Sequence, residues 1–141
     1  MVKLSGEQVR DYAAHLIQLT MGGEIGSRAK NEFEECDIVD IWGLFDGDFL
    51  TTVVGIGSEI SSKKVWLGYF AVSPQYQNKG LGTKAIAFIE KEIQNRGYKW
   101  IYIETYENER FDAAVRLYKK TGYKKVGELA GFLDGLKVRG G

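Results

Sequence analysis

The segment SPQYQNKGLGTKAIAFIEKEIQNRGY, residues 73–98, decides the fold because it joins a polar turn to a long amphipathic run. Two glycines, Gly80 and Gly82, stand one residue apart where the turn gives way to the run. Apolar side chains recur at helical spacing after them, which predicts a helix over residues 80–95. Gly97 then fits the left-handed position that ends such a helix. The segment therefore predicts a turn whose backbone is open at the start of a helix.

The stretch before this turn, KVWLGYFAV at residues 64–72, is apolar almost throughout. Such a run is typical of a strand that is covered on both faces, so we expect it at the centre of a sheet. The turn at residues 74–79 then lies between the carboxyl end of a central strand and the amino end of a helix. Backbone N–H groups there lack partners within the helix and lie at the positive end of its dipole. They form a site for an anion such as phosphate.

Glycine at both positions lets a diphosphate approach the backbone without a Cβ atom in the way. The Thr83 hydroxyl can add a hydrogen bond, and Lys79 and Lys84 can add charge. Glycines at this spacing also permit close packing of a helix on a strand, so they do not by themselves settle the ligand. A Walker A loop is excluded because Thr83 and Lys84 come in the wrong order. A dinucleotide fingerprint with Ala85 in its last position stays open.

Strand and helix patterns alternate along the rest of the chain. Ser5-Gly6-Glu7-Gln8 has the form of a capping box, which predicts a helix from Gly6 to about Thr20. Its apolar face is expected to carry Val9, Tyr12, Ala13, Leu16 and Ile17. The other predicted elements are a short helix at 27–34, a hairpin of strands at 37–45 and 49–56, a polar loop at 58–63, a strand at 100–106, a helix that carries Phe111, Ala114, Val115 and Tyr118, a strand at 123–129 and at most one short strand after residue 130.

This order of elements, β-β-β-α-β-α-β behind an N-terminal helical segment, predicts an α+β fold. The sheet is expected to be mixed and largely antiparallel, with a parallel strand-helix-strand unit at its core. The chain has 141 residues and shows no linker or internal repeat. A single domain over residues 1–141 is therefore expected.

The composition of the chain excludes several classes of binding partner. Nineteen basic residues balance nineteen acidic ones, so no global field draws in nucleic acid or a membrane surface. The one cysteine, Cys36, excludes an internal disulfide and is interpreted as a buried thiol. Apolar stretches fall short of the roughly 20 residues that a membrane span needs, and the polar N-terminus lacks signal-peptide character. A cytoplasmic protein is expected, without nucleic-acid or membrane partners.

Two signatures in order resemble those of the GNAT N-acetyltransferase superfamily. YFAVSPQYQNKGLGTKAIAFIEKEI resembles its motif A, whose Gln/Arg-x-x-Gly-x-Gly/Ala pattern is matched by Gln77, Gly80 and Gly82. Downstream, AAVRLYKKTGYKKVGEL resembles the second signature, an alanine-rich helix with a tyrosine followed by Gly-aromatic and a strand. The resemblance spans residues 64–129. It implies the GNAT fold, with helices on both faces of the sheet.

The resemblance also implies the activity, which is transfer of an acetyl group from acetyl-CoA to a primary amine. In the family the amine attacks directly in a ternary complex, without a metal. The acceptor is then a small-molecule or peptide amine, and a homodimer is common. A noncatalytic acyl-CoA-binding module or sensor on the same fold remains the alternative.

Binding residues follow from the family pattern. The pyrophosphate lies on backbone amides of residues 77–83, and the pantetheine pairs with the strand that ends at Val72. That strand splays from the one at 100–106, and amides near its end polarise the thioester carbonyl. The family's asparagine is replaced by Phe111, and Asn108, on a longer loop, is the candidate to take over its contact. The implied cofactor-binding residues are Phe70, Ala71, Val72, Gln77, Asn78, Lys79, Gly80, Leu81, Gly82, Thr83 and Asn108.

Tyr118 matches the family tyrosine that protonates the departing CoA thiolate. It also shares an apolar stripe with core residues, so a packing role stays open. Glu104, near a strand end, is the candidate general base, directly or through water, although a strand-end glutamate is commonly solvated. Glu107 is a weaker alternative to it. His15 belongs to the surface of the first helix rather than to catalysis.

Acidic residues gather at 32–40, before the first hairpin. In the family this part of the chain often shapes the acceptor site, so a cationic amine would suit it. A charge cluster of this kind also commonly forms a solvated face.

Overall fold

The computed structural model describes residues 1–22, 26–27, 31, 40–106, 111–129 and 133–140. Within these residues, seven strands form one twisted sheet in the order β1-β2-β3-β4-β5-β7-β6. Among the strands of the described residues, only β4 and β5 run parallel and the other neighbours are antiparallel, so the predicted mixed sheet is confirmed. The strands are β1 (Val2–Lys3), β2 (Ile41–Asp46), β3 (Phe49–Ser61), β4 (Lys64–Val72), β5 (Trp100–Tyr106), β6 (Lys124–Leu129) and β7 (Leu133–Gly140).

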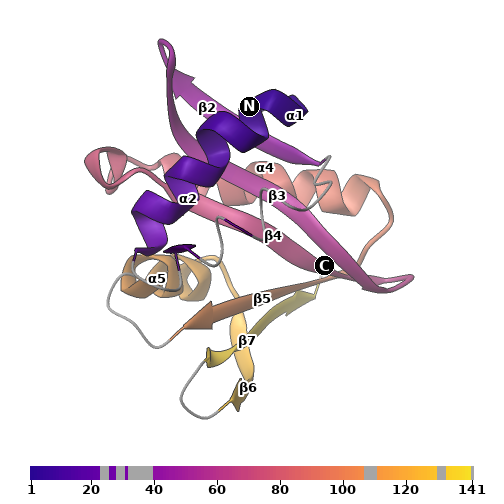
Figure 1. The fold of residues 1–141 in the computed structure, drawn as a ribbon. Coiled ribbons are helices and arrows are strands. Elements are labelled where there is room, and N and C mark those ends of the chain that lie inside the picture. The colour runs from indigo at the N-terminus through magenta and orange to yellow at the C-terminus, as the bar shows by residue number, and fades with distance from the viewer. Residues whose placement is uncertain (23–25, 28–30, 32–39, 107–110, 130–132, 141) are drawn as a thin grey trace.

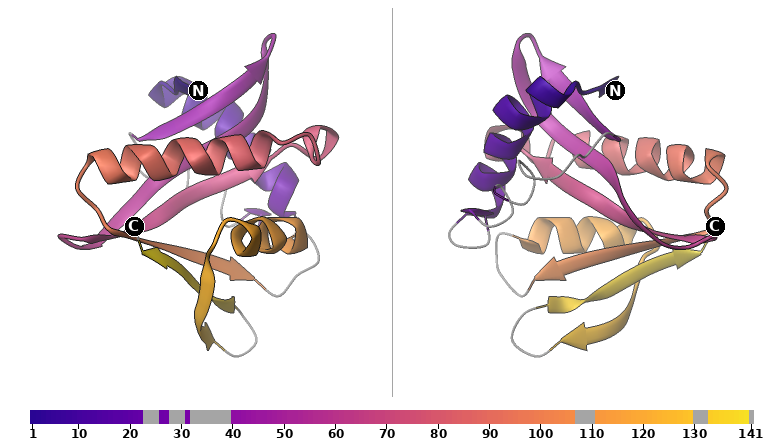
Figure 2. Two further views of the ribbon diagram at one scale, coloured as in Figure 1. Left: turned by 180° about the vertical axis from the view of Figure 1, so that it is seen from behind. Right: turned by 45° about the vertical axis from the view of Figure 1, so that its right-hand side comes forward.

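Helices cover both faces of this sheet (Figure 1). An N-terminal helical run packs on one face and comprises α1 (Gly6–Gln8), a π-helical turn (Val9–Ala13) and α2 (Ala14–Met21). The opposite face carries α4 (Leu81–Asn95) and α5 (Asp112–Lys120), as the view from behind shows (Figure 2). Each face has its own buried apolar cluster, and β4 contributes to both. This position confirms β4 as a central strand.

The N-terminal run begins as the sequence predicts. Ser5 N donates to Gln8 Oε1 at 3.0 Å, and Gln8 N donates to Ser5 Oγ at 3.2 Å, which completes the capping box. Tyr12 was wrongly placed on the apolar face, because 52% of it is exposed. The wider π-helical turn rotates it away from Val9 and Ala13, which are buried.

Two boundaries differ from the sequence prediction. The polar loop expected at 58–63 is wrong, because β3 continues to Ser61 and pairs there with Lys64. The last four residues of β3, 58–61, are exposed to solvent, and polar side chains are compatible with a strand there. The helix expected at 27–34 and the start of the strand expected at 37–45 lie largely outside the described residues.

The last strand is longer than the short one predicted. β7 spans 8 residues and inserts between β5 and β6, pairing with both. Backbone hydrogen bonds to two neighbours stabilise a strand whose sequence pattern is weak.

The pairing of β4 with β5 is short, and this shapes the candidate site. Its parallel ladder with β5 comprises three pairs, the last being Trp66 with Tyr102. The two strands separate beyond that point. A β-bulge follows directly, because Val54 pairs with Phe70 while Ile56 pairs with Leu67. A Cβ atom on Gly68 would lie 2.9 Å from the backbone of Gly55, so only glycine fits there.

Candidate functional site

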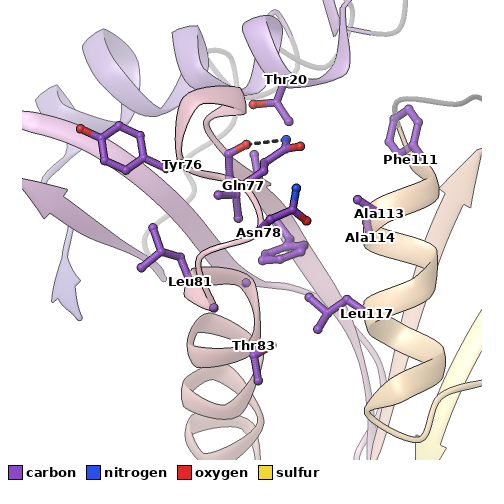
Figure 3. Close-up of a pocket in the computed structure, with 15 residues that line it drawn as sticks. Thr20, Tyr76, Gln77, Asn78, Leu81, Thr83, Phe111, Ala113, Ala114 and Leu117 are labelled. Carbon is purple, nitrogen blue, oxygen red and sulfur yellow. Dashed lines mark hydrogen bonds between the residues drawn. The ribbon is translucent and has the colours of Figure 1, made fainter.

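The chain leaves β4 through a compact loop that is tied back to the sheet. Ser73 N donates to Thr51 O at 2.7 Å, and a short 3-10 turn, Pro74–Tyr76, follows. Gln77 Nε2 donates to the carbonyl of Val72 at 3.1 Å (Figure 3). The family glutamine therefore folds the loop onto the strand end through its side chain.

The loop ends in left-handed backbone and opens into α4. Asn78 has φ of 64° and Gly80 has φ of 82°, and Gly80 is the N-cap of the helix. Glycine has no side chain to cap the helix, so within the described part of the chain the first-turn N–H groups donate to no N-cap side chain. These groups lie at the positive end of a helix of 15 residues, which favours an anion.

Close packing also explains why glycine occupies position 82. A Cβ atom there would lie 3.0 Å from Leu117 Cδ2 and 3.3 Å from Phe70 Cζ. The absence of a side chain lets the start of α4 approach both β4 and α5. Close helix packing, the alternative for the paired glycines, is thus realised at Gly82, whereas Gly80 has open space around it and instead provides the positive φ.

A cavity of about 190 Å³ lies where β4 and β5 separate, between this loop and α5 (Figure 3). Nine of the eleven predicted cofactor-binding residues line it. Of the other two, Lys79 is not a lining residue, and Asn108 lies outside the described residues. The cavity is lined by Thr20, Phe70, Ala71, Val72, Tyr76, Gln77, Asn78, Gly80, Leu81, Gly82, Thr83, Phe111, Ala113, Ala114 and Leu117.

Sequence reasoning missed the remaining lining residues as site residues. Phe111, Ala114 and Leu117 form an apolar wall from the start of α5, and the helical spacing of the first two was the available signal. Thr20 comes from the end of α2. Its Oγ1 is buried and has no hydrogen-bond partner among the described residues. Nothing local in the sequence distinguishes this threonine from a surface one.

Tyr118 lies in the core cluster on the α4 side of the sheet and is 5% exposed. Its ring packs against Phe70, with centroids 6.1 Å apart, and against Tyr123 at 5.9 Å. Burial raises the pKa of the Tyr118 phenol, so it stays protonated well above neutral pH. Tyr118 is not itself a lining residue, although Leu117 beside it is.

Glu104 is not brought to the cavity. It is exposed and pairs in register with Leu136 on β7, and it is not a lining residue. Its neighbours Ile101 and Ile103 take the core positions, so strand alternation turns Glu104 to the other face. His15 is exposed on the N-terminal helical run. Cys36, Glu107 and nearly all of the acidic 32–40 segment lie outside the described residues.

Two kinds of feature are absent from the described part of the chain. No group of three or more His, Cys, Asp or Glu side chains there could hold a metal ion. No described helix combines the length and the apolar character that a membrane crossing requires.

The GNAT fold class is defined by a mixed sheet in which one parallel pair of strands separates. A loop suited to binding an anion, followed by a helix, lies at the point of separation. The sequence profile of the Acetyltransferase (GNAT) family matches residues 25–123. The chain belongs to this family.

Two curated relatives and several solved structures are similar to the chain. A spermine/spermidine N(1)-acetyltransferase of Bacillus subtilis (strain 168) is 39% identical over 67 residues, which are 47% of this chain and 43% of that protein. A probable spermine N(1)-acetyltransferase of B. subtilis subsp. natto (strain BEST195) matches to the same extent. The match therefore covers less than half the length of these relatives.

Among solved structures, the PaiA N-acetyltransferase of Thermoplasma acidophilum in complex with coenzyme A gives a TM-score of 0.81 at 16% identity, covering 99% of this chain and 96% of that one. An aminoglycoside 6'-acetyltransferase type Ii gives 0.79 at 23% identity, covering 98% and 94%. At these identities the likeness shows the shared fold, and it confirms the predicted GNAT architecture.

Proposed function

We propose that this protein is an N-acetyltransferase that transfers an acetyl group from acetyl-CoA to a primary amine by direct attack in a ternary complex. One observation carries the proposal. A single cavity joins the uncapped start of α4 to the part of β4 that has separated from β5. A ligand with an anionic diphosphate and an extended pantetheine chain, such as acetyl-CoA, would bind to the helix start and to β4 at the same time.

The acyl donor would bind mainly through backbone groups. Its diphosphate would accept hydrogen bonds from N–H groups of residues 77–83, where the helix dipole adds favourable potential. Lys84 in the first turn of α4 would add charge. The pantetheine arm would pair with β4 beyond Trp66, where the strand has no partner on the β5 side among the described residues. The apolar wall from α5 would cover its methylene groups.

Chemistry would take place near the carboxyl end of β4. The neutral amine nitrogen attacks the thioester carbon, and the backbone amides of residues 70–72 stabilise the oxyanion that develops. The carbon–sulfur bond then breaks, and the Tyr118 phenol gives its proton to the thiolate. The amine loses its proton to a base for which Glu104 is our candidate through water, with Glu107 as the alternative.

Polyamines are the acceptor class to test first, because the curated relatives carry polyamine acetyltransferase names. Small-molecule amines of other kinds and peptide amines form the comparison panel. We further propose a cytoplasmic protein that acts without nucleic-acid or membrane partners and assembles as a homodimer.

The proposal is tested in two steps on the full chain. A thermal-shift comparison of acetyl-CoA, NAD and ATP should show stabilisation by acetyl-CoA alone. Release of CoA thiol should then depend on an added amine. Preference for NAD would overturn the acyl-CoA assignment.

Binding of acetyl-CoA without turnover on any amine would instead identify a noncatalytic acyl-CoA sensor. That second candidate has one observation in its favour, since the candidate base Glu104 lies away from the cavity lining.

A further inference from the structure

Tyr76 connects the loop that lines the cavity to the tip of the β2–β3 hairpin. Its hydroxyl donates to Asp46 Oδ2 at 2.7 Å. Its ring stacks on Phe49, with centroids 5.6 Å apart and planes inclined by 23°. Asp46 ends β2 and Phe49 begins β3, so one tight turn supplies both contacts.

The hairpin tip is a firm support for these contacts. β2 and β3 pair over six residue pairs, and Gly47 takes the positive φ of 60° that a two-residue turn requires. β3 is held in turn by β4 on its other side. A side chain bonded to this tip is therefore fixed relative to the sheet.

Among the described residues, the other side-chain hydrogen bond that ties this loop to the sheet runs from Gln77 Nε2 to the carbonyl of Val72. Asn78 holds a left-handed conformation, with φ of 64°, that L-residues adopt at a cost. Tyr76 is separated from it by one residue and lines the same cavity. The Lys79 ammonium lies 5.3 Å from the centroid of the Tyr76 ring, within range of a cation–π contact. Tyr76 thus contacts the hairpin tip and also Lys79, which belongs to the predicted diphosphate-binding segment 77–83.

We propose that Tyr76 is a positioning residue for the acyl donor: anchored to Asp46 and Phe49, it holds residues 77–79 in the conformation that receives the diphosphate. This inference rests on the proposed function. It adds the β2–β3 hairpin tip to the donor site, although the tip does not itself line the cavity.

The contacts are poorly suited to a purely stabilising role. Asp46 is exposed, as is 44% of Phe49, and exposed polar contacts contribute little to the stability of a fold. The hydrogen bond to Asp46 raises the pKa of Tyr76, so the phenol remains a donor at neutral pH. The effect of losing this bond should therefore be seen in ligand binding rather than in unfolding.

Calorimetric titration with acetyl-CoA and steady-state kinetics test the proposal. Tyr76→Phe keeps the stack and removes the hydrogen bond. It should raise Kd and KM for acetyl-CoA by about 3- to 10-fold, the range that the net contribution of one typical hydrogen bond gives. The kcat, the KM for the amine and the Tm should be unchanged. Asp46→Ala should have the same effect, and the double variant should be no worse than either.

Two controls sharpen the result. Asp46→Asn retains an oxygen that can accept a hydrogen bond from the phenol, so this variant should keep most of the affinity. Tyr98→Phe removes a similar exposed bond, from Tyr98 to Glu59 Oε2 at 3.1 Å, on a residue that does not line the cavity. Its Kd should match that of the unsubstituted protein.

Unchanged affinity in Tyr76→Phe, or additive losses in the double variant, would overturn the positioning role while the proposed function stands. Failure of the unsubstituted protein to bind acetyl-CoA would remove the proposed function and this inference together. A drop in Tm that accounts for the lost affinity would assign Tyr76 to the fold instead.

Discussion

The rings of Phe70 and Tyr118 pack against each other at 6.1 Å between centroids, with their planes inclined by 52°. Phe70 lines the cavity, whereas Tyr118 lies in the core cluster next to it. Tyr118 therefore has a packing role in the free protein, whatever its hydroxyl does in the reaction. Only a substitution that keeps the ring can separate the two roles.

Tyr118→Phe is expected to lower kcat by roughly 10²- to 10⁴-fold, the contribution of a positioned general acid. The affinity for acetyl-CoA and the Tm should be retained, because the ring still packs against Phe70 and Tyr123. Stopped assays of CoA release give kcat, and calorimetry gives the affinity. An acyl donor with a more acidic leaving thiol should rescue the variant more than the unsubstituted protein. Equal turnover in both proteins would make Tyr118 a core residue alone.

Gly82→Asp is expected to abolish acetyl-CoA binding, because its carboxylate would stand at the diphosphate site. The structure adds a steric cost, since a Cβ atom at Gly82 lies 3.0 Å from Leu117 Cδ2. Gly82→Asn has nearly the same shape without the charge, so it isolates the electrostatic part. Its affinity should fall less than that of the aspartate variant, and circular dichroism should show both folded. Equal losses in the two variants would point to packing alone.

Thr20→Val should weaken binding of acetyl-CoA by about 3- to 10-fold, because the buried hydroxyl that lacks a partner among the described residues would gain one in the complex. Removing the hydroxyl from the free protein should leave the Tm equal or higher, since no described hydrogen bond is lost. Thr20→Ser is the matched control and should keep the affinity. Tight binding by the valine variant would show that the hydroxyl does not contact the donor.

Asp40 is expected to contribute an acid-sensitive part of the stability. Its hydrogen bond from Arg96, at 2.9 Å, lowers the pKa of the Asp40 carboxyl, against a smaller opposing effect of burial. A depressed pKa in the folded state stabilises the fold above the unfolded pKa of about 3.9, and the contribution is lost as the pH falls through the folded value.

The expected size of this contribution is at most about 1 kcal/mol, because both side chains are partly exposed. Asp40→Asn should therefore reduce the free energy of unfolding at neutral pH and flatten its fall below about pH 4. Urea titrations across that range measure both effects. Asp48→Asn, at an exposed residue of the hairpin turn, is the control. It should leave the fall in the free energy of unfolding below about pH 4 unchanged. An unchanged acid limb in Asp40→Asn would contradict the assignment.

Features that depend on local pattern were predictable from the sequence. The apolar run at residues 64–72 predicted the bounds of β4, and the two glycines at the start of α4 predicted the loop that lines the cavity. Capping by Ser5 and Gln8 was readable for the same reason, since all the groups involved lie within one turn.

Features that depend on distant neighbours were not predictable. Thr20 reaches the cavity only because α2 lies across the sheet, and Tyr76 meets Asp46 across 30 positions of sequence. The length of β7 is set by partners on both sides, not by its own alternation. Tyr12 shows a third cause, because a single π-helical turn was enough to shift the phase of the helical pattern.

The early separation of β4 from β5 gives the sheet an edge in its interior, in addition to its two outer ones. An open edge offers main-chain donors and acceptors that are the same for every amino acid. A ligand that pairs with it does so without reading side chains. The side chains of residues 67–72 are consequently set by the core and by the bulge, where Gly55 approaches Gly68, and the opening between the two strands is what a ligand would meet.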